Sequence, residues 1–186
     1  MEDSQIVDLY WERNESALTK TAEKYGRFCF SVAYNILNNH EDSEECVNDT
    51  YLEAWEAMPP QRPKLLSAFL AKITRNNAIN RVRFLKRKKR MDDKTDILLS
   101  ELEDCFPSNK SAEDKFDEAY AAGIISKYLS DVSQNKAAIF VFRYFFCYSI
   151  EELSAKTGYS ESKVASMLFR MRGELKIRLE KGGIKI

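Results

Sequence analysis

Residues 149–172, SIEELSAKTGYSESKVASMLFRMR, are the most informative stretch of this chain for its fold. Ser149 stands three residues before Glu152, which is the spacing of a capping box that opens a helix. Gly158 can end that helix, and Ser160 can cap the next one. Apolar residues then recur at helical spacing, at Val164, Leu168, Met171, Leu175 and Leu179. A short helix, a turn with a glycine and a longer helix predict a helix-turn-helix, although any hairpin of two helices shares this pattern.

Composition extends the helical interpretation to the whole chain. Of 186 residues, 44% are hydrophobic, which is enough to bury a core and excludes wholesale disorder. Six glycines and four prolines are too few for an all-β chain with many tight turns. The longest apolar run, AAIFVF at 137–142, is far shorter than the about 20 residues of a membrane helix. The start MEDSQ lacks the basic residues of a secretory signal. We expect an all-α, cytoplasmic protein without membrane insertion.

Metal and nucleophile chemistry have few candidate residues. The four cysteines form no C-x-x-C pair, and His40 is the only histidine, whereas zinc sites need clustered ligands. Cys29, Cys46 and Cys147 stand in helical apolar patterns, which predicts small buried side chains. The chain has no glycine-rich phosphate loop. We therefore expect no metal, no cofactor, no small-molecule substrate and no enzymatic activity.

Charge is sorted along the chain although the net charge is zero. Residues 91–120 carry 3 Lys or Arg against 10 Asp or Glu, while the segments on both sides carry a basic excess. Helical periodicity also breaks between about 91 and 112, where acidic and polar residues dominate. This pattern predicts two small helical domains, at 1–90 and 113–186, joined by an acidic linker at 91–112.

A basic helix is expected at about 65–90, after a proline-rich loop at 58–66. Between Lys72 and Arg90 the sequence has nine Lys or Arg and no acidic residue, which is typical of a surface that attracts phosphates. Asparagine on the same face can read a base edge. The candidate DNA-binding residues on this helix are Arg75, Asn76, Asn80, Arg83 and Arg87.

The preceding helix, expected at 42–57 from a capping box at Asp42 and Glu45, has an acidic face that would repel DNA. Such a face either contacts a protein partner or is simply solvated. The last helix presents a further candidate DNA-reading face opposite its apolar residues, made of Glu161, Ser162, Lys163, Ser166 and Arg170.

Three stretches together resemble a known family. DSEECVNDTYLEAW at 42–55 and FLAKITRNNAINRVR at 69–83 are similar to the two signature stretches of sigma region 2, and residues 149–172 are similar to sigma region 4. Their order and the acidic linker resemble the bacterial RNA polymerase sigma factors of the extracytoplasmic-function type. The resemblance covers about residues 15–179.

The resemblance implies a promoter-specificity subunit without catalytic activity. Its partners would be promoter DNA and core RNA polymerase, through the clamp of the largest subunit and the flap of the second-largest subunit, with a separate anti-sigma protein as regulator. The basic helix would contact the −10 element, the 58–66 loop would hold a flipped base, and the last helix would read the −35 element. The residues implied to dock on the clamp are Asp42, Glu45, Asn48 and Asp49.

Two other interpretations remain open at this point. A stand-alone helix-turn-helix regulator would bind a DNA palindrome as a dimer. A helical enzyme would use the acidic cluster around Glu44, Glu45 and Asp49 with a divalent metal.

Overall fold

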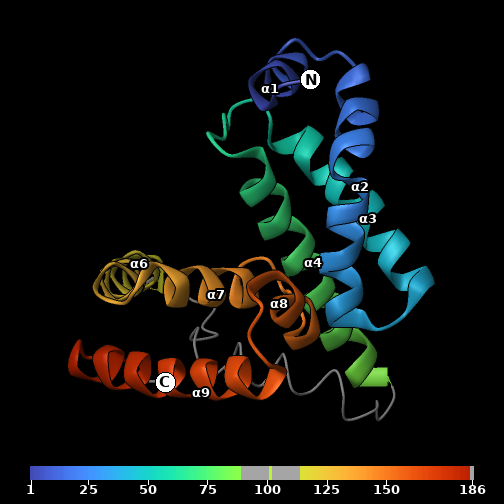
Figure 1. Cartoon of the computed structure of the whole chain (residues 1–186). Helices are drawn as coiled ribbons and strands as arrows, with labels where there is room; N and C mark the ends of the chain where they lie inside the picture. The colour runs from blue at the N-terminus through green and yellow to red at the C-terminus, as the bar shows by residue number, and fades with distance from the viewer. Residues whose placement is uncertain (89–100, 102–113, 185–186) are drawn as a thin grey trace. The chain divides into compact units, whose positions relative to one another are not determined.

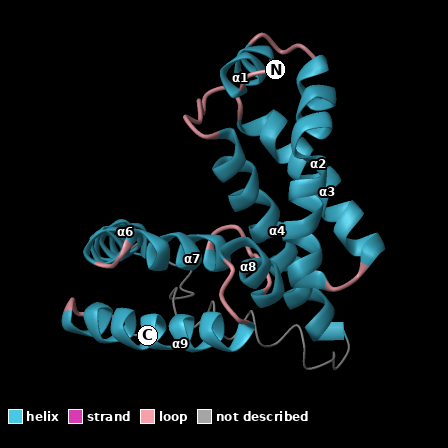
Figure 2. Ribbon diagram, viewed as in Figure 1, coloured by secondary structure: helices cyan, strands magenta, loops and turns pink. Residues whose placement is uncertain are grey.

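The structure is a computed structural model that describes residues 1–88, 101 and 114–184. All regular secondary structure in these residues is helical, which confirms the all-α prediction (Figure 2). The predicted linker at 91–112 lies outside the described residues except for Glu101. The helices are α1 (Asp3–Trp11), α2 (Ser16–Leu37), α3 (His40–Ala57), α4 (Leu66–Lys88), α6 (Asp114–Asp131), α7 (Gln134–Tyr144), α8 (Ile150–Thr157) and α9 (Glu161–Lys181).

The chain divides into two compact units, one of residues 1–95 with 145–147 and the other of residues 96–144 with 148–186. In the first unit, α2, α3 and α4 pack against one another, and α1 lies at the end of this bundle where α2 begins (Figure 1). The core takes apolar side chains from all four helices, among them Ile6, Tyr10, Cys29, Ala54 and Leu70.

Polar contacts inside the first unit fix α3 against α4. The Thr50 hydroxyl donates to the Thr74 hydroxyl at 3.1 Å, and the Cys46 thiol donates to the Thr74 carbonyl at 3.4 Å. All three side chains are buried, so each hydroxyl or thiol needs such a partner. Cys29, Cys46 and Cys147 are buried thiols that form no disulfide within the described residues, and their burial agrees with the prediction from the sequence.

The junction of α2 and α3 corrects one prediction. Asn38 ends α2 in the left-handed conformation, with φ of 49°, and the Asn39 side chain accepts a hydrogen bond from the Asp42 backbone. The cap of α3 is therefore Asn39, and the helix begins at His40 rather than at Asp42. The Asp42 carboxylate is instead used in an ion pair with α4.

The second unit is built around α9, which packs against α6, α7 and α8. The predicted capping box is present at the start of α8, because the Ser149 and Glu152 side chains each accept from the other's backbone N–H. Gly158 follows α8 with φ of 71°, and the Ser160 side chain caps α9. The expected apolar face of α9 is buried at Val164, Leu168, Met171, Leu175 and Leu179.

None of the described helices combines the length and the apolar character needed to cross a membrane.

Candidate nucleic-acid and protein interfaces

The candidate DNA-binding residues of α4 lie on its solvent side. Asn76 and Asn80 are exposed, while Arg75 and Arg83 are partly exposed. Arg87 lies in the last turn of α4, and its side chain is outside what the structure describes. The opposite face is buried through Leu70, Thr74, Ala78 and Val82. The helix thus holds the Asn76 and Asn80 amides and the Arg83 guanidinium near one surface, where they can donate to phosphate oxygens or base edges. The Arg75 guanidinium instead lies 5.8 Å from the centroid of the Phe145 ring, and burial lowers its pKa.

The four candidate residues for protein docking lie on α3. Glu45, Asn48 and Asp49 are exposed, and Asp42 is partly exposed. Arg81 of α4 pairs with two of them, at 2.6 Å to the Asp42 carboxylate and 2.9 Å to the Glu45 carboxylate. The hydrogen bond that Arg81 donates to the Asp42 carboxylate is the largest of the effects that raise the Arg81 pKa, so Arg81 is a fixed cation at this edge of the face.

A groove that the sequence did not indicate lies beside this face. It has a volume of about 640 Å³ and is lined by residues from the start of α2 and from α3. Asn48 belongs both to the groove and to the acidic face, and Leu52 at its edge is 58% exposed. The remaining lining residues are Glu15, Ser16, Leu18, Thr19, Tyr51 and Trp55.

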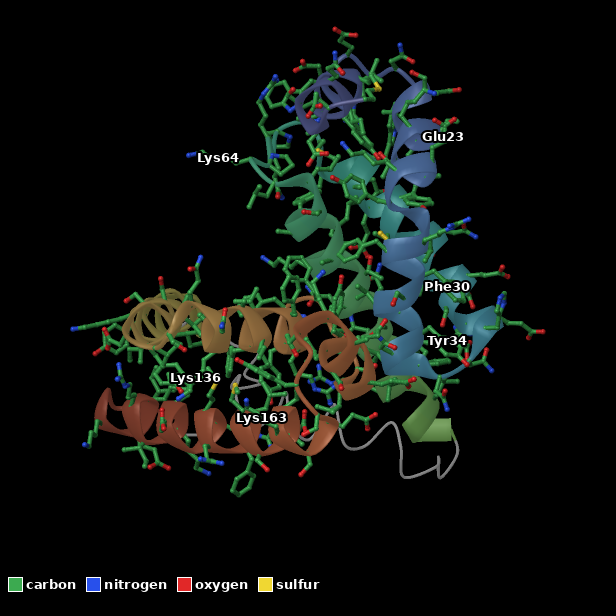
Figure 3. All side chains as sticks on the ribbon, viewed as in Figure 1. Glu23, Phe30, Tyr34, Lys64, Lys136 and Lys163 are labelled. Carbon is green, nitrogen blue, oxygen red and sulfur yellow. The ribbon has the colours of Figure 1, made fainter. Side chains whose placement is uncertain are left out.

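The 58–66 loop between α3 and α4 is anchored at both ends and exposed between them. Met58 and Leu66 are fully buried, whereas Leu65 is 66% exposed. Lys64 extends from the loop away from the bundle (Figure 3). The loop therefore offers a short exposed segment next to the start of the basic helix.

All five candidate residues at the start of α9 are exposed: Glu161, Ser162, Lys163, Ser166 and Arg170. The Lys163 ammonium lies 3.7 Å from the centroid of the Tyr159 ring, an attractive cation–π contact within the turn. The face also contains Phe169, which is 70% exposed. Polar donors, an acceptor and an aromatic ring are thus displayed on the side of α9 that does not form the core.

Glu101 makes a contact that the sequence did not predict. Its carboxylate pairs with Arg143 of α7 at 2.9 Å and with Arg172 of α9 at 3.3 Å. The Arg172 guanidinium also donates to the Tyr144 hydroxyl at 2.7 Å. Arg172 is therefore engaged within the second unit. The two arginines lie 42 and 71 residues after Glu101 in the sequence. Helical periodicity relates residues within one helix, so no sequence pattern predicts these ion pairs.

The acidic residues considered for metal chemistry are exposed and the cysteines considered for nucleophile chemistry are buried in the part of the chain that the structure describes. No three His, Cys, Asp or Glu side chains converge there as metal ligands, and Glu44, Glu45 and Asp49 lie on the exposed surface of α3. Burial raises the pKa of Cys29 to about 11 and that of Cys46 to about 12, which keeps both thiols protonated and poorly nucleophilic.

The first unit has a basic, amide-bearing face on α4 and an acidic face on α3, and a basic face of this kind is typical of nucleic-acid-binding modules. Comparison with known families specifies the kind of module, because residues 21–88 match the family model of sigma-70 region 2. The matched residues contain most of α2 and all of α3 and α4. No curated protein matches the chain. The predicted resemblance to the sigma-70 factors is thus confirmed at region 2.

Proposed function

We propose that the chain is a promoter-specificity subunit that binds core RNA polymerase and directs transcription initiation at −10 and −35 elements. The match of residues 21–88 to sigma-70 region 2 carries this proposal, because that family acts in promoter recognition and transcription initiation. The two-domain arrangement with a region 4 helix-turn-helix, typical of the extracytoplasmic-function type, is the finer part of the proposal. So is control by a separate anti-sigma protein, which only the family resemblance suggests.

The −10 element is assigned to α4 and the loop before it. The supporting observation is that Asn76, Asn80 and Arg83 reach the surface of a helix whose solvent side has basic and amide groups without acids. Arg75 and Arg87 of the same helix are included in this assignment. In the opened promoter, the exposed 59–65 loop would hold an unstacked base by its backbone and side chains.

Docking on the clamp of the largest polymerase subunit is assigned to Asp42, Glu45, Asn48 and Asp49. An acidic face repels DNA and is complementary to a basic protein surface, so charge favours a protein partner there. The −35 element is assigned to Glu161, Ser162, Lys163, Ser166 and Arg170, because the N-terminal residues of the second helix enter the major groove in a helix-turn-helix. The same unit would contact the flap of the second-largest subunit.

The first test is run-off transcription on fragmented genomic DNA with core polymerase, with and without the protein. New start sites that share two upstream elements are expected. No new start sites, together with tight binding of a homodimer to palindromic DNA without polymerase, would establish the stand-alone regulator instead.

Two variants separate the assigned surfaces. Asn80→Ala combined with Arg83→Ala should abolish promoter opening and leave the affinity for core polymerase unchanged, while Arg27→Ala, an exposed cation on α2, serves as the control. Full transcription by the double variant would remove α4 from the −10 assignment.

Asp49→Lys should weaken binding to core polymerase about tenfold or more, because it reverses one charge at the docking face. Glu23→Lys makes the same charge change at an exposed position of α2, outside the docking face, and should bind core polymerase normally. Equal affinities of the two variants would refute the docking assignment.

A further inference from the structure

Helix α1 lies outside the residues that match sigma-70 region 2. It nevertheless contacts both ends and the middle of the loop between α3 and α4. Ile6, Val7 and Tyr10 of α1 are buried in the same core cluster as Met58 and Leu66, the two ends of this loop. Figure 1 shows α1 beside the loop at one end of the bundle. The apolar side of α1 therefore fixes where the loop leaves α3 and where it enters α4.

The other side of α1 holds the middle of the loop. The Trp11 indole nitrogen donates to the Gln61 carbonyl at 3.2 Å. The Arg62 guanidinium lies over the Trp11 ring, 5.3 Å from its centroid, and also pairs with the Asp8 carboxylate. One backbone carbonyl and one side chain at the centre of the loop are thus bound by two residues of α1.

Asp3 at the start of α1 lies close to the end of the loop. Its carboxylate accepts from the Lys24 ammonium at 2.8 Å and from the Tyr25 hydroxyl at 2.5 Å, and the Leu66 backbone at the beginning of α4 helps to lower its pKa. Burial alone would raise the pKa of Asp3, but these hydrogen bonds outweigh it and lower the pKa. Asp3 is therefore charged at neutral pH and stabilises the N-terminus of α4, where a negative charge is favourable.

We propose that α1 is a positioning segment for the 59–65 loop: Asp8 and Trp11 hold Gln61 and Arg62 on one side, so that Lys64 and Leu65 are presented in a fixed geometry on the other. This inference rests on the proposed function, in which the loop holds a base of the −10 element. A loop that must order itself when a base arrives loses affinity for that base, whereas a loop already fixed does not. The consequence is faster promoter opening.

The test uses charge reversal at the pair of Asp8 and Arg62, because both side chains are about half exposed and neither belongs to the core. Asp8→Arg places two cations together, and Asp8→Arg combined with Arg62→Asp restores an ion pair of opposite direction. Glu12→Arg, at the exposed end of the same helix, makes the same charge change without a loop contact and is the matched control. Trp11→Phe keeps a ring under Arg62 but removes the donor to Gln61.

The first readout does not depend on polymerase. Hydrogen exchange of the Gln61 amide, which donates to the Ala57 carbonyl at 3.0 Å, should be about tenfold faster in the free full-length chain for Asp8→Arg and Trp11→Phe than for the unaltered protein. The double reversal and Glu12→Arg should exchange at the original rate. Unchanged exchange in Asp8→Arg would overturn the positioning role even if the protein proves to be a sigma factor.

The second readout is the rate of promoter opening by the holoenzyme, followed by 2-aminopurine fluorescence in the −10 element of a promoter mapped by run-off transcription. Asp8→Arg should slow opening about tenfold without changing the affinity for core polymerase, and the double reversal should restore the rate. Failure of the double reversal to restore opening would overturn the inference. Failure of the unaltered protein to open any promoter would instead overturn the proposed function.

Discussion

Glu101→Gln should destabilise the second unit by about 2 kcal/mol. The Glu101 carboxylate is the shared partner of Arg143 and Arg172, whose side chains are only 8% and 17% exposed. Removing one partner of a buried ion pair costs about 3–5 kcal/mol, because the remaining charge stays buried without compensation. The glutamine amide still accepts one hydrogen bond and the site is partly reached by water, so we expect a value below that range.

Hydrogen exchange followed by mass spectrometry measures this effect within the intact chain. A loss of about 2 kcal/mol corresponds to about 30-fold faster exchange through local opening, because each 1.4 kcal/mol is about tenfold. The acceleration should appear in peptides from α7 and α9, which contain the two arginines. In the control Glu23→Gln, which breaks an exposed pair with Lys20, exchange should change by less than about threefold. Exchange of α7 and α9 at the original rate in Glu101→Gln would refute the argument.

Three further predictions concern the first unit. Thr74→Val removes the hydroxyl that Thr50 contacts in the core and should lower the free energy of unfolding by about 1 kcal/mol. The urea midpoint measured by tryptophan fluorescence reports this loss, since Trp11 and Trp55 both lie in this unit. An unchanged midpoint would contradict the prediction. Asp3→Asn should destabilise the unit at pH 7, and the difference should shrink as the pH falls below about 4 and vanish below the folded-state pKa, because a lowered carboxyl pKa contributes its full stability only above the pKa of the unfolded chain. A difference that does not shrink between pH 5 and pH 2 would argue against a charge effect. Alkylation of Cys29 and Cys46 at pH 8, resolved by mass spectrometry, should be at least about 100-fold slower in the folded protein than in urea, and fast labelling of the folded protein would show that these thiols are accessible.

The local features of this fold were predictable because their causes lie within a few residues of sequence. The capping box of α8 at Ser149 and Glu152 is an interaction across three positions, and the buried face of α9 follows from helical spacing. The exposure of Asn76 and Asn80 on α4 follows from the same periodicity. The roles of these residues stay predictions, because a pattern of faces does not say what binds to a face.

The features that the sequence did not reveal depend on contacts between distant positions. Asp42 has the spacing of a capping residue, but its carboxylate pairs with Arg81, 39 positions away. The residue that caps α3 is Asn39. The loop contacts from α1 join positions 50 and 54 residues apart. Propensity and periodicity describe one helix at a time, so such pairs become visible only when the helices are packed.

The ion pairs of Arg81 also decide which part of the acidic face is best suited to a protein partner. Arg81 offsets charge at Asp42 and Glu45, so an incoming basic side chain would compete with a cation already in place there. Asn48 and Asp49 lie one turn further along α3, are exposed, and adjoin the groove whose edge includes Leu52. Interfaces gain most of their affinity where apolar contact and complementary charge coincide. Docking energy is therefore expected to concentrate at the end of the face formed by Asn48, Asp49 and Leu52, which is why Asp49→Lys tests the docking assignment more severely than a change at Glu45.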